Sequence, residues 1–549
     1  MSDMKREFKD LVRFEHYDNL NSEITGDYNE VLAVKCVNGT FVGTVEHGVA
    51  SWLGIPYAKP PVGERRFKAP EYVDADDRVF EAKYYGKGAF GSLGYGDCIQ
   101  KRESEDCLYL NIWVNTDDKT EKKPVMVWIH GGAYVVGSGS QASYSGANLV
   151  QAQSDIIMVN INYRLNMYGF MDFSSVPGGE KFGTAPCNGL LDQAMALRWV
   201  HENIAAFGGD PDNVTIFGQS AGGGSVSILP VMKEANSYFQ KVIAQSGSTT
   251  LAFPVECESA QGKTKALLEY TGCKTMDDIM ALSEEELQKA YVEAVGVFTS
   301  CPYYGTEVLP EAPIEMYRKG YAKNISIMAG STADEARLFM GEDAGLNFEE
   351  QKLFAGRAVG DAALCLKEDD KKYYEEFGRV CRTPEPGLME TEFMNELMFR
   401  VPMLQQLDAQ SAFNKTFCYY WSYPGSDADI GAAHSVELMF VFNMRGFGTS
   451  SPFNGTNIPD EIFTTVQQMW TNFARCGNPS TDKVEWKAYS ADDPNVLDIA
   501  GPDDISIKHG LLVDQYKAVL PLVGYYQFMD KYFTPHYLLD IIAARGQNS

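Results

Sequence analysis

The sequence contains no run of 18 or more apolar residues, so it has no segment long enough to cross a membrane as a helix. Its first residues, Met1–Glu7, carry charges with no apolar stretch behind them, which predicts that there is no secretory signal. Cysteine pairs at the spacing of a metal site, such as Cys-x-x-Cys, are also missing. We therefore expect no membrane anchor, no metal and no cofactor.

Positive charge is scarce, because the chain has 47 Lys and Arg residues but 74 Asp and Glu residues. Its formal net charge is -27. An acidic surface repels phosphate backbones and anionic headgroups. The charge therefore argues against a nucleic-acid partner and mildly favours neutral or cationic small-molecule substrates. Solubility alone is the simpler explanation of this charge.

Cysteine is present as 11 residues, an odd number, so at least one is unpaired or paired between chains. Most lie in apolar stretches, as Cys418 does in Thr-Phe-Cys-Tyr-Tyr, which is typical of small core residues. This usage favours a reducing compartment. We expect a cytoplasmic protein, and secretion after removal of a leader is the alternative.

The composition is that of a globular protein, with 45% hydrophobic and 22% charged residues and no internal repeat. We expect one domain over residues 1–549. Within it, residues 255–400 are rich in Glu, Lys and Met at helical spacing, which predicts a helical insertion over the active site. Three short strands are predicted near the start, at Val31–Lys35, Thr40–His47 and Ala50–Ile55.

Apolar, β-branched runs at Leu108–Val114, Pro124–Ile129 and Asp155–Asn162 have the pattern of central strands that are buried on both faces. Residues 189–207 have helical spacing of apolar residues, and Val214–Phe217 follows as another buried strand. Alternation of strands and helices predicts an α/β fold with a large, mostly parallel twisted sheet flanked by helices.

The strongest motif is Gly-Gln-Ser-Ala-Gly at residues 218–222, which follows a buried strand and precedes small residues that can open a helix. This is the pattern of a nucleophile elbow, in which a tight turn lifts a serine hydroxyl clear of the sheet. The flanking glycines leave room for the turn, and the helix N-terminus favours negative charge beside the serine. We therefore predict Ser220 as the nucleophile.

A second glycine-rich loop, Trp-Ile-His-Gly-Gly-Ala-Tyr at residues 128–134, follows another buried strand. In folds with a nucleophile elbow this loop supplies backbone N–H groups to the oxyanion of the transition state. We predict the amides of Gly132, Ala133 and Ala221 as the donors. His130 resembles a catalytic base, but in this position we expect it to orient the loop.

A serine hydroxyl needs a base, and in this fold the base follows the nucleophile and the acid along the chain. Three histidines lie beyond Ser220: His434, His509 and His536. His434 stands in a loop of small residues between two apolar runs, whereas the other two have charged or aromatic neighbours. Loop placement and chain order favour His434.

The acid is expected between them, at the end of the strand that Ile325–Ala329 predicts. Catalytic groups collect at the carboxyl ends of strands in open α/β sheets. Asp334 and Glu335 both follow this strand, and spacing alone does not separate them. Either carboxylate would fix the tautomer of the histidine and stabilise its imidazolium.

Taken in order, these motifs resemble the type B carboxylesterase and cholinesterase family, and within it the bacterial p-nitrobenzyl-esterase-like carboxylesterases. The resemblance runs from about residue 30 to residue 500. It implies an α/β-hydrolase fold and the hydrolysis of carboxylic esters through an acyl-enzyme. The stretches that carry it are Gly54–Ala58, Ser104–Asn111, Asn162–Arg164 and Gly189–Pro211.

The resemblance assigns the acid to Glu335, although Ala336 stands where the family motif Asp-Glu-Gly has glycine. It also implies that Ser246 supports the acid and base from behind. Gln219 stands where the family usually has glutamate, which removes a negative charge beside the site and weakens any preference for cationic substrates.

Cholinesterases carry a tryptophan on a long disulfide loop that stacks on choline. Here only eight residues separate Cys98 from Cys107 and none is tryptophan, so choline esters are not expected as substrates. The resemblance places four residues along the acyl and alcohol pockets: Gly296, Phe298, Phe253 and Phe339.

Three functions are compatible with these residues. A carboxylesterase for small to medium neutral esters is favoured, and the loop at residues 131–133 resembles that of esterases that accept hindered alcohols. An amidase or carbamate hydrolase would use the same triad. A non-catalytic binding protein is the third alternative, but such relatives usually lack a triad residue.

Overall fold

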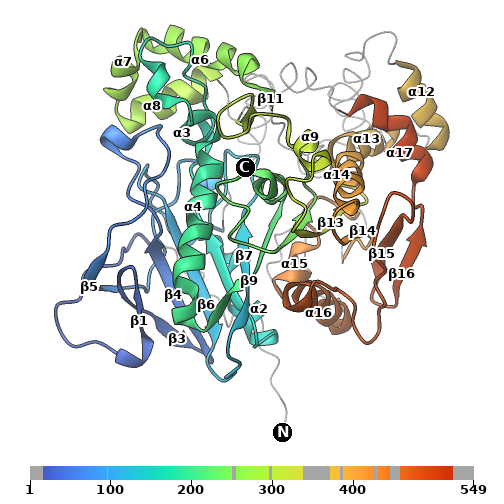
Figure 1. Cartoon of the computed structure of the whole chain (residues 1–549), viewed down its shortest axis with the longest axis horizontal. Coiled ribbons are helices and arrows are strands. Elements are labelled where there is room, and N and C mark those ends of the chain that lie inside the picture. Colours follow the sequence, from blue (N-terminus) through green and yellow to red (C-terminus); the bar gives the residue numbers. More distant parts are fainter. Residues whose placement is uncertain are drawn as a thin grey trace, which may run out of the picture.

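The computed structural model describes residues 17–94, 97–249, 255–295, 300–337, 371–383, 388–425, 431–445 and 458–523. Within these ranges, strands from both halves of the chain form an 11-stranded sheet (Figure 1). From one edge to the other its strands are β16 (Asp504–His509), β15 (Asn495–Gly501), β14 (Thr416–Trp421), β13 (Ser326–Thr332), β10 (Lys241–Gln245), β9 (Gly209–Gln219), β7 (Lys123–Ile129), β8 (Ile157–Ile161), β6 (Tyr109–Asn115), β4 (Val49–Pro56) and β3 (Thr44–Glu46).

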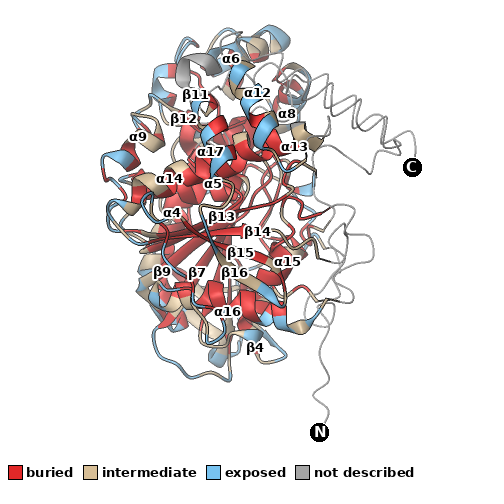
Figure 2. Cartoon of the chain, turned by 90° about the vertical axis from the view of Figure 1, so that its right-hand side faces the viewer, coloured by how far each residue is buried: buried red, intermediate tan, exposed pale blue. Residues whose placement is uncertain are grey.

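The seven strands from β15 to β8 run parallel to their neighbours, whereas β16 at one edge and β6, β4 and β3 at the other pair antiparallel. Parallel strands need crossovers, and helices between them cover both faces of such a sheet. Figure 2 shows α5 and α16 on opposite sides of the buried strands. The mostly parallel sheet with flanking helices, predicted from the sequence, is confirmed.

The helices between the sheet strands include α4 and α5, which run before and after β9, and α14, which packs on β13 and β14. The described helices are α2 (Ala147–Ala152), α3 (Asn166–Gly169), α4 (Asn188–Asn203), α5 (Ala221–Ile228), α6 (Cys257–Thr271), α7 (Met276–Met280), α8 (Glu284–Ala290), α9 (Pro313–Arg318), α12 (Lys371–Val380), α13 (Leu388–Asn395), α14 (Val401–Ser411), α15 (Leu438–Val441), α16 (Asp460–Cys476) and α17 (Val513–Val519). Helices α6 to α9, α12 and α13 lie within residues 255–400, and their role as an insertion over the site stays a prediction, as does the single domain over residues 1–549.

The predicted strand Thr40–His47 is wrong as a single element. Gly43 divides it into β2 (Asn38–Val42) and β3, and a Cβ at Gly43 would lie 2.4 Å from the carbonyl oxygen of Ser51. Strand β2 joins a small separate sheet with β1 (Ala33–Cys36) and β5 (Asp76–Glu81). Alternation alone does not reveal this division, because one close backbone approach redirects the chain between two sheets.

The remaining differences are one shifted element end and a few elements that the sequence did not predict. The predicted strand Val31–Lys35 begins later, because Glu30–Leu32 form a 3-10 turn before β1. Beyond Gly501, where the sequence pattern predicted nothing, the chain forms β16 and α17. A further short pair, β11 (Val255–Glu256) and β12 (Tyr303–Tyr304), is parallel.

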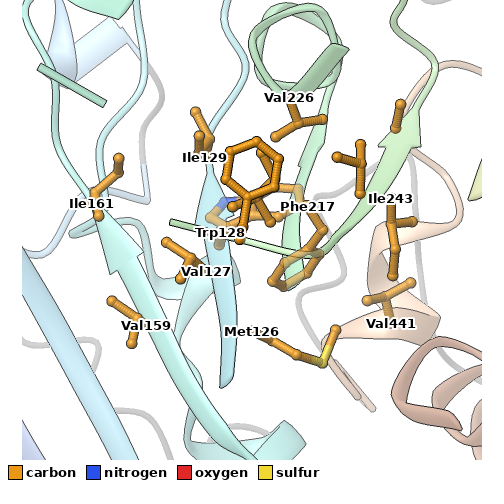
Figure 3. Packing of buried hydrophobic residues seen from close by; sticks show 14 of the residues in the cluster. Met126, Val127, Trp128, Ile129, Val159, Ile161, Phe217, Val226, Ile243 and Val441 are labelled. Atoms are coloured by element: carbon orange, nitrogen blue, oxygen red, sulfur yellow. The ribbon is translucent and has the colours of Figure 1, made fainter. Parts of the chain in front are cut away.

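The core is centred on β7, β8 and β9 (Figure 3). Trp128 on β7 is fully buried and packs against the rings of Phe217 on β9 and Phe442, with centroids 4.9 Å away in both cases. These contacts immobilise the strand ends from which the glycine-rich loop and the serine turn emerge. The core therefore fixes two of the predicted site elements relative to each other.

Two buried ion pairs involve residues of the stretches that carry the family resemblance. Nη2 of Arg66 lies 2.6 Å from the carboxylate of Glu105. Nη1 of Arg66 donates to the carbonyl oxygens of Met280 and Leu282. Arg164 binds Asp192 at 2.7 Å with both groups buried. Because removal of one partner would leave an uncompensated buried charge, these residues constrain the fold rather than the chemistry.

Candidate active site

Ser220 stands between β9 and α5 with φ 58° and ψ -125°, a strained backbone conformation for a residue with a side chain. The turn leaves no room beside it. A Cβ at Gly222 would lie 2.0 Å from the carbonyl oxygen of Ile129, and one at Gly218 would lie 2.6 Å from the backbone of Gly222. The two glycines are thus required by close backbone approach, as the motif predicted.

His434 and Glu335 are brought together from the loops after β14 and β13. The Nδ1 atom of His434 lies 2.5 Å from Oε2 of Glu335, and both side chains are buried. The other carboxylate oxygen of Glu335 accepts from the backbone N–H of Thr332 at 2.7 Å. Because the carboxylate accepts, Nδ1 donates its proton, and Nε2 is left as the hydrogen-bond acceptor of the ring.

Asp334, the competing acid, takes a different position. Its carboxylate accepts from the backbone N–H of Ala432 at 3.0 Å, and its own N–H donates to the carbonyl oxygen of Ala432 at 2.9 Å. Asp334 therefore ties the loop of the acid to the loop of His434. The competing histidine His509 is exposed and lies 3.3 Å from Asp493, and His536 lies outside the described residues.

Gln219 contacts the predicted base, His434, directly. Its Nε2 lies 2.9 Å from Nε2 of His434. Since the ring nitrogen is the acceptor, the amide of Gln219 donates to it. A glutamate of the same length could not donate there in its ionised form. Glutamine in place of the usual family glutamate thus puts a neutral hydrogen-bond donor on Nε2 of His434, the nitrogen that would accept a proton if His434 is the base.

The glycine-rich loop lies next to Ser220, since a Cβ at Gly131 would lie 3.0 Å from the Cβ of Ser220. Gly132 and Ala133 have φ values of 109° and 53°, and the carbonyl oxygen of Gly132 accepts from the N–H groups of Val135 and Val136, at 2.9 and 3.0 Å. The amides of Gly132, Ala133 and Ala221 donate to no acceptor within the described ranges. Their role as donors to the oxyanion therefore stays a prediction.

His130 supports this loop. Its ring is buried, stacks on Tyr163 at a centroid distance of 4.5 Å, and Nδ1 lies 2.8 Å from the carbonyl oxygen of Gly131. The hydroxyl of Tyr163 donates to the carbonyl oxygen of His130 at 2.8 Å. Burial lowers the pKa of His130 to about 4, so the ring is neutral at physiological pH.

A buried polar layer lies near the predicted acid, Glu335. Ser246 is buried with φ 46°, and its N–H donates to the carbonyl oxygen of Gly330 at 2.8 Å. Glu437 is fully buried, and one of its oxygens accepts from the side chain of Gln245 at 3.1 Å. Burial, together with the charge of Glu335, raises the pKa of Glu437 to about 8.

Sequence reasoning gave no role to Phe399, whose ring centroid lies 5.1 Å from that of His434. Nothing in the sequence distinguishes Phe399 from the other phenylalanines, of which the chain has 30 in all. The predicted pocket residues lie outside the described residues, so their roles stay predictions: Gly296, Phe298, Phe253 and Phe339.

Among the residues that the structure describes, no group of three or more His, Cys, Asp or Glu side chains could hold a metal ion. Within the same residues, no helix has the length and apolarity to span a bilayer. Cys107 is a buried free thiol, and burial holds its pKa well above the usual range.

Comparison with known proteins finds similarity over nearly the whole described chain. The model of the carboxylesterase family matches residues 30–517. The chain is 37% identical over 469 residues to para-nitrobenzyl esterase of Bacillus subtilis, covering 82% of this chain and 91% of that protein. It is 29% identical over 504 residues to phenmedipham hydrolase of Pseudarthrobacter oxydans, covering 86% and 97%.

Solved structures agree with these relatives. A carboxylesterase of Geobacillus stearothermophilus superposes with a TM-score of 0.76 at 34% identity, covering 89% of this chain and 99% of that one. A para-nitrobenzyl esterase structure gives a TM-score of 0.75 at the same identity and coverage. The fold is therefore that of the α/β-hydrolases, as the resemblance implied.

Glu437→Gln tests the buried layer through stability. Between the ordinary glutamate value of 4.5 and about 8, folded Glu437 keeps a proton that the unfolded chain has lost. Stability of the wild type should therefore fall as pH rises through this window, by at most roughly 1.4 kcal/mol per pH unit from this group. Glutamine at position 437 does not titrate, so the variant does not lose this stability. The unfolding free energy of the variant minus that of wild type should therefore increase from pH 5 to pH 8. An equal difference at both pH values in urea titrations would contradict the assignment.

Proposed function

The chain belongs to the carboxylesterase family and is a carboxylic ester hydrolase, and we propose that Ser220, His434 and Glu335 carry out the hydrolysis. The observation that carries this proposal is the buried contact between Nδ1 of His434 and the carboxylate of Glu335, 2.5 Å long. This contact leaves Nε2 of His434 as a proton acceptor. That nitrogen lies 2.9 Å from the side-chain amide of Gln219, the residue before Ser220.

In the first step, the Oγ of Ser220 attacks the ester carbonyl while His434 takes the hydroxyl proton on Nε2. The carbonyl oxygen becomes an oxyanion, for which the N–H groups of Gly132, Ala133 and Ala221 are the proposed donors. Loss of one such donor typically costs about 10²–10³ in turnover. Collapse of the intermediate breaks the bond to the alcohol, which leaves with the proton from Nε2.

In the second step, a water molecule attacks the acyl-enzyme and gives its proton to the same nitrogen. Collapse returns that proton to Oγ and releases the carboxylic acid. Through both steps Glu335 keeps Nδ1 protonated and offsets the positive charge that forms on the ring. Gln219 has to release Nε2 for each proton transfer, because that nitrogen has one lone pair.

For the substrate we propose small to medium neutral esters, including hindered ones. Gln219 puts a neutral amide, rather than a carboxylate, beside the base, which offers no attraction to a cationic group. The relatives named para-nitrobenzyl esterase support an uncharged ester. A cytoplasmic location is part of the proposal and is supported by the buried free thiol of Cys107.

Ser220→Ala should remove the nucleophile and lower kcat for a short p-nitrophenyl ester by at least about 10⁴-fold, because catalytic triads act as units. Wild type should also show a burst of p-nitrophenol equal to the enzyme concentration if deacylation is slower than acylation, and a fluorophosphonate should label Ser220. A variant that hydrolyses the ester as fast as wild type would refute the proposed nucleophile.

Gln219→Glu should shift the acid limb of kcat/KM for a neutral ester to higher pH, by roughly one unit. An ionised carboxylate cannot donate to Nε2 and instead favours a protonated ring that cannot act as a base. Gln219→Met, of similar size and without charge, is the matched control and should leave the limb near its wild-type position. If the two variants have superimposable pH profiles, the charge at this position does not act on the base.

A further inference from the structure

The last residue of α13, Asn395, contacts the turn that carries Glu335. Asn395 is 5% exposed. Its Nδ2 donates to the carbonyl oxygen of Ala333 at 2.9 Å, and its Oδ1 accepts from the N–H of Ala336 at 2.7 Å. One side-chain amide therefore binds the backbone on both sides of the acid.

These two backbone groups have a particular relation. In a four-residue turn, the carbonyl oxygen of the first residue commonly accepts from the N–H of the fourth. Ala333 and Ala336 are the first and fourth residues around Asp334 and Glu335, yet they do not bond to each other directly. The amide of Asn395 stands in place of that bond, so it sets how far the turn opens and where the carboxylate of Glu335 lies.

The same element also contacts the base. Helix α13 continues into a single π-helical turn, Glu396–Arg400, and Phe399 within it packs on the ring of His434. Turns of this kind inside helices are frequent at functional sites. The acid is thus held from Asn395 and the base is packed from four residues further along the chain.

Helix α13 is itself anchored at this position. Its buried Glu392 accepts from Nε of Arg382 at 3.1 Å, and Nη2 of Arg382 donates to the carbonyl oxygen of Ala333 at 3.0 Å. The carbonyl oxygen of Ala333 therefore receives two side-chain donors, and both come from the segment around α13. These bonds make the position of Asn395 relative to the turn well defined.

We propose that Asn395 is a positioning residue for the hydrolysis, which holds Glu335 where it accepts the Nδ1 proton of His434. The inference rests on the proposed function, since it assigns a task within that triad. Asn395 is not expected to touch substrate. Its loss should therefore lower kcat and leave KM nearly unchanged.

Asn395→Ala is compared with Asn203→Ala. Asn203, at the end of α4, is also 5% exposed and also bridges two backbone groups, the N–H of Val37 and the carbonyl oxygen of Trp199, each at 2.8 Å. Both variants lose the same kind of buried bridge, so similar decreases in Tm are expected. We expect kcat of Asn395→Ala to fall about 10- to 10²-fold, as for a small misplacement of a catalytic group, with KM within about twofold. The control should keep the kcat of wild type.

Both rates are expressed per enzyme that a fluorophosphonate labels at Ser220, so that unfolded protein does not count. If Asn395→Ala is not obtained folded, the kcat of Asn395→Asp is compared with that of the control instead. This variant keeps the acceptor for the N–H of Ala336 and loses the donor to the carbonyl oxygen of Ala333. A kcat within twofold of the Asn203→Ala control overturns the inference. Failure of the proposed function is distinguished by Ser220→Ala, which would then retain wild-type activity in the same assay.

Discussion

The hydrogen bond between His434 and Glu335 is the constraint on which the rest of the proposed site depends. Both groups are buried, and a carboxylate out of contact with water is costly unless its oxygens are bonded. Here one oxygen accepts from the imidazole and the other from the backbone of Thr332. This arrangement holds the ring in one orientation and directs the remaining nitrogen toward the elbow.

The parallel sheet brings these groups together because neighbouring strands end at the same edge. Strands β13 and β14 pair in parallel, so the proposed acid and the proposed base lie side by side in the loops that follow these strands. Strand β10 lies between β13 and β9, and the carbonyl oxygen of Gln245 at its end accepts from the N–H of Ser220 at 2.9 Å. Strand β7 adds the glycine-rich loop from the other side of β9. Long-range packing thus brings the four predicted motifs to one edge of the sheet, where they form the proposed site.

The motifs with strong local rules were predictable from sequence. Close backbone approach demands glycine on both sides of Ser220, and the loop of small residues separated His434 from His509. Asp334 and Glu335 could not be separated by spacing, because both follow the same strand and only their bonds to Ala432 and His434 distinguish them. Contacts of Gln219 and Asn395 depend on packing between distant segments, for which one sequence carries no local signal.

Selective ¹⁵N labelling of the seven histidines would test the central interaction most directly, since the ¹⁵N chemical shifts report which ring nitrogen carries the proton. The signals of His434 are identified by their loss in His434→Gln. The account predicts an imidazole of the resting enzyme that is protonated on Nδ1, with its proton far downfield and moved upfield in Glu335→Gln. A neutral ring protonated on Nε2, or a proton signal that Glu335→Gln leaves in place, would contradict it.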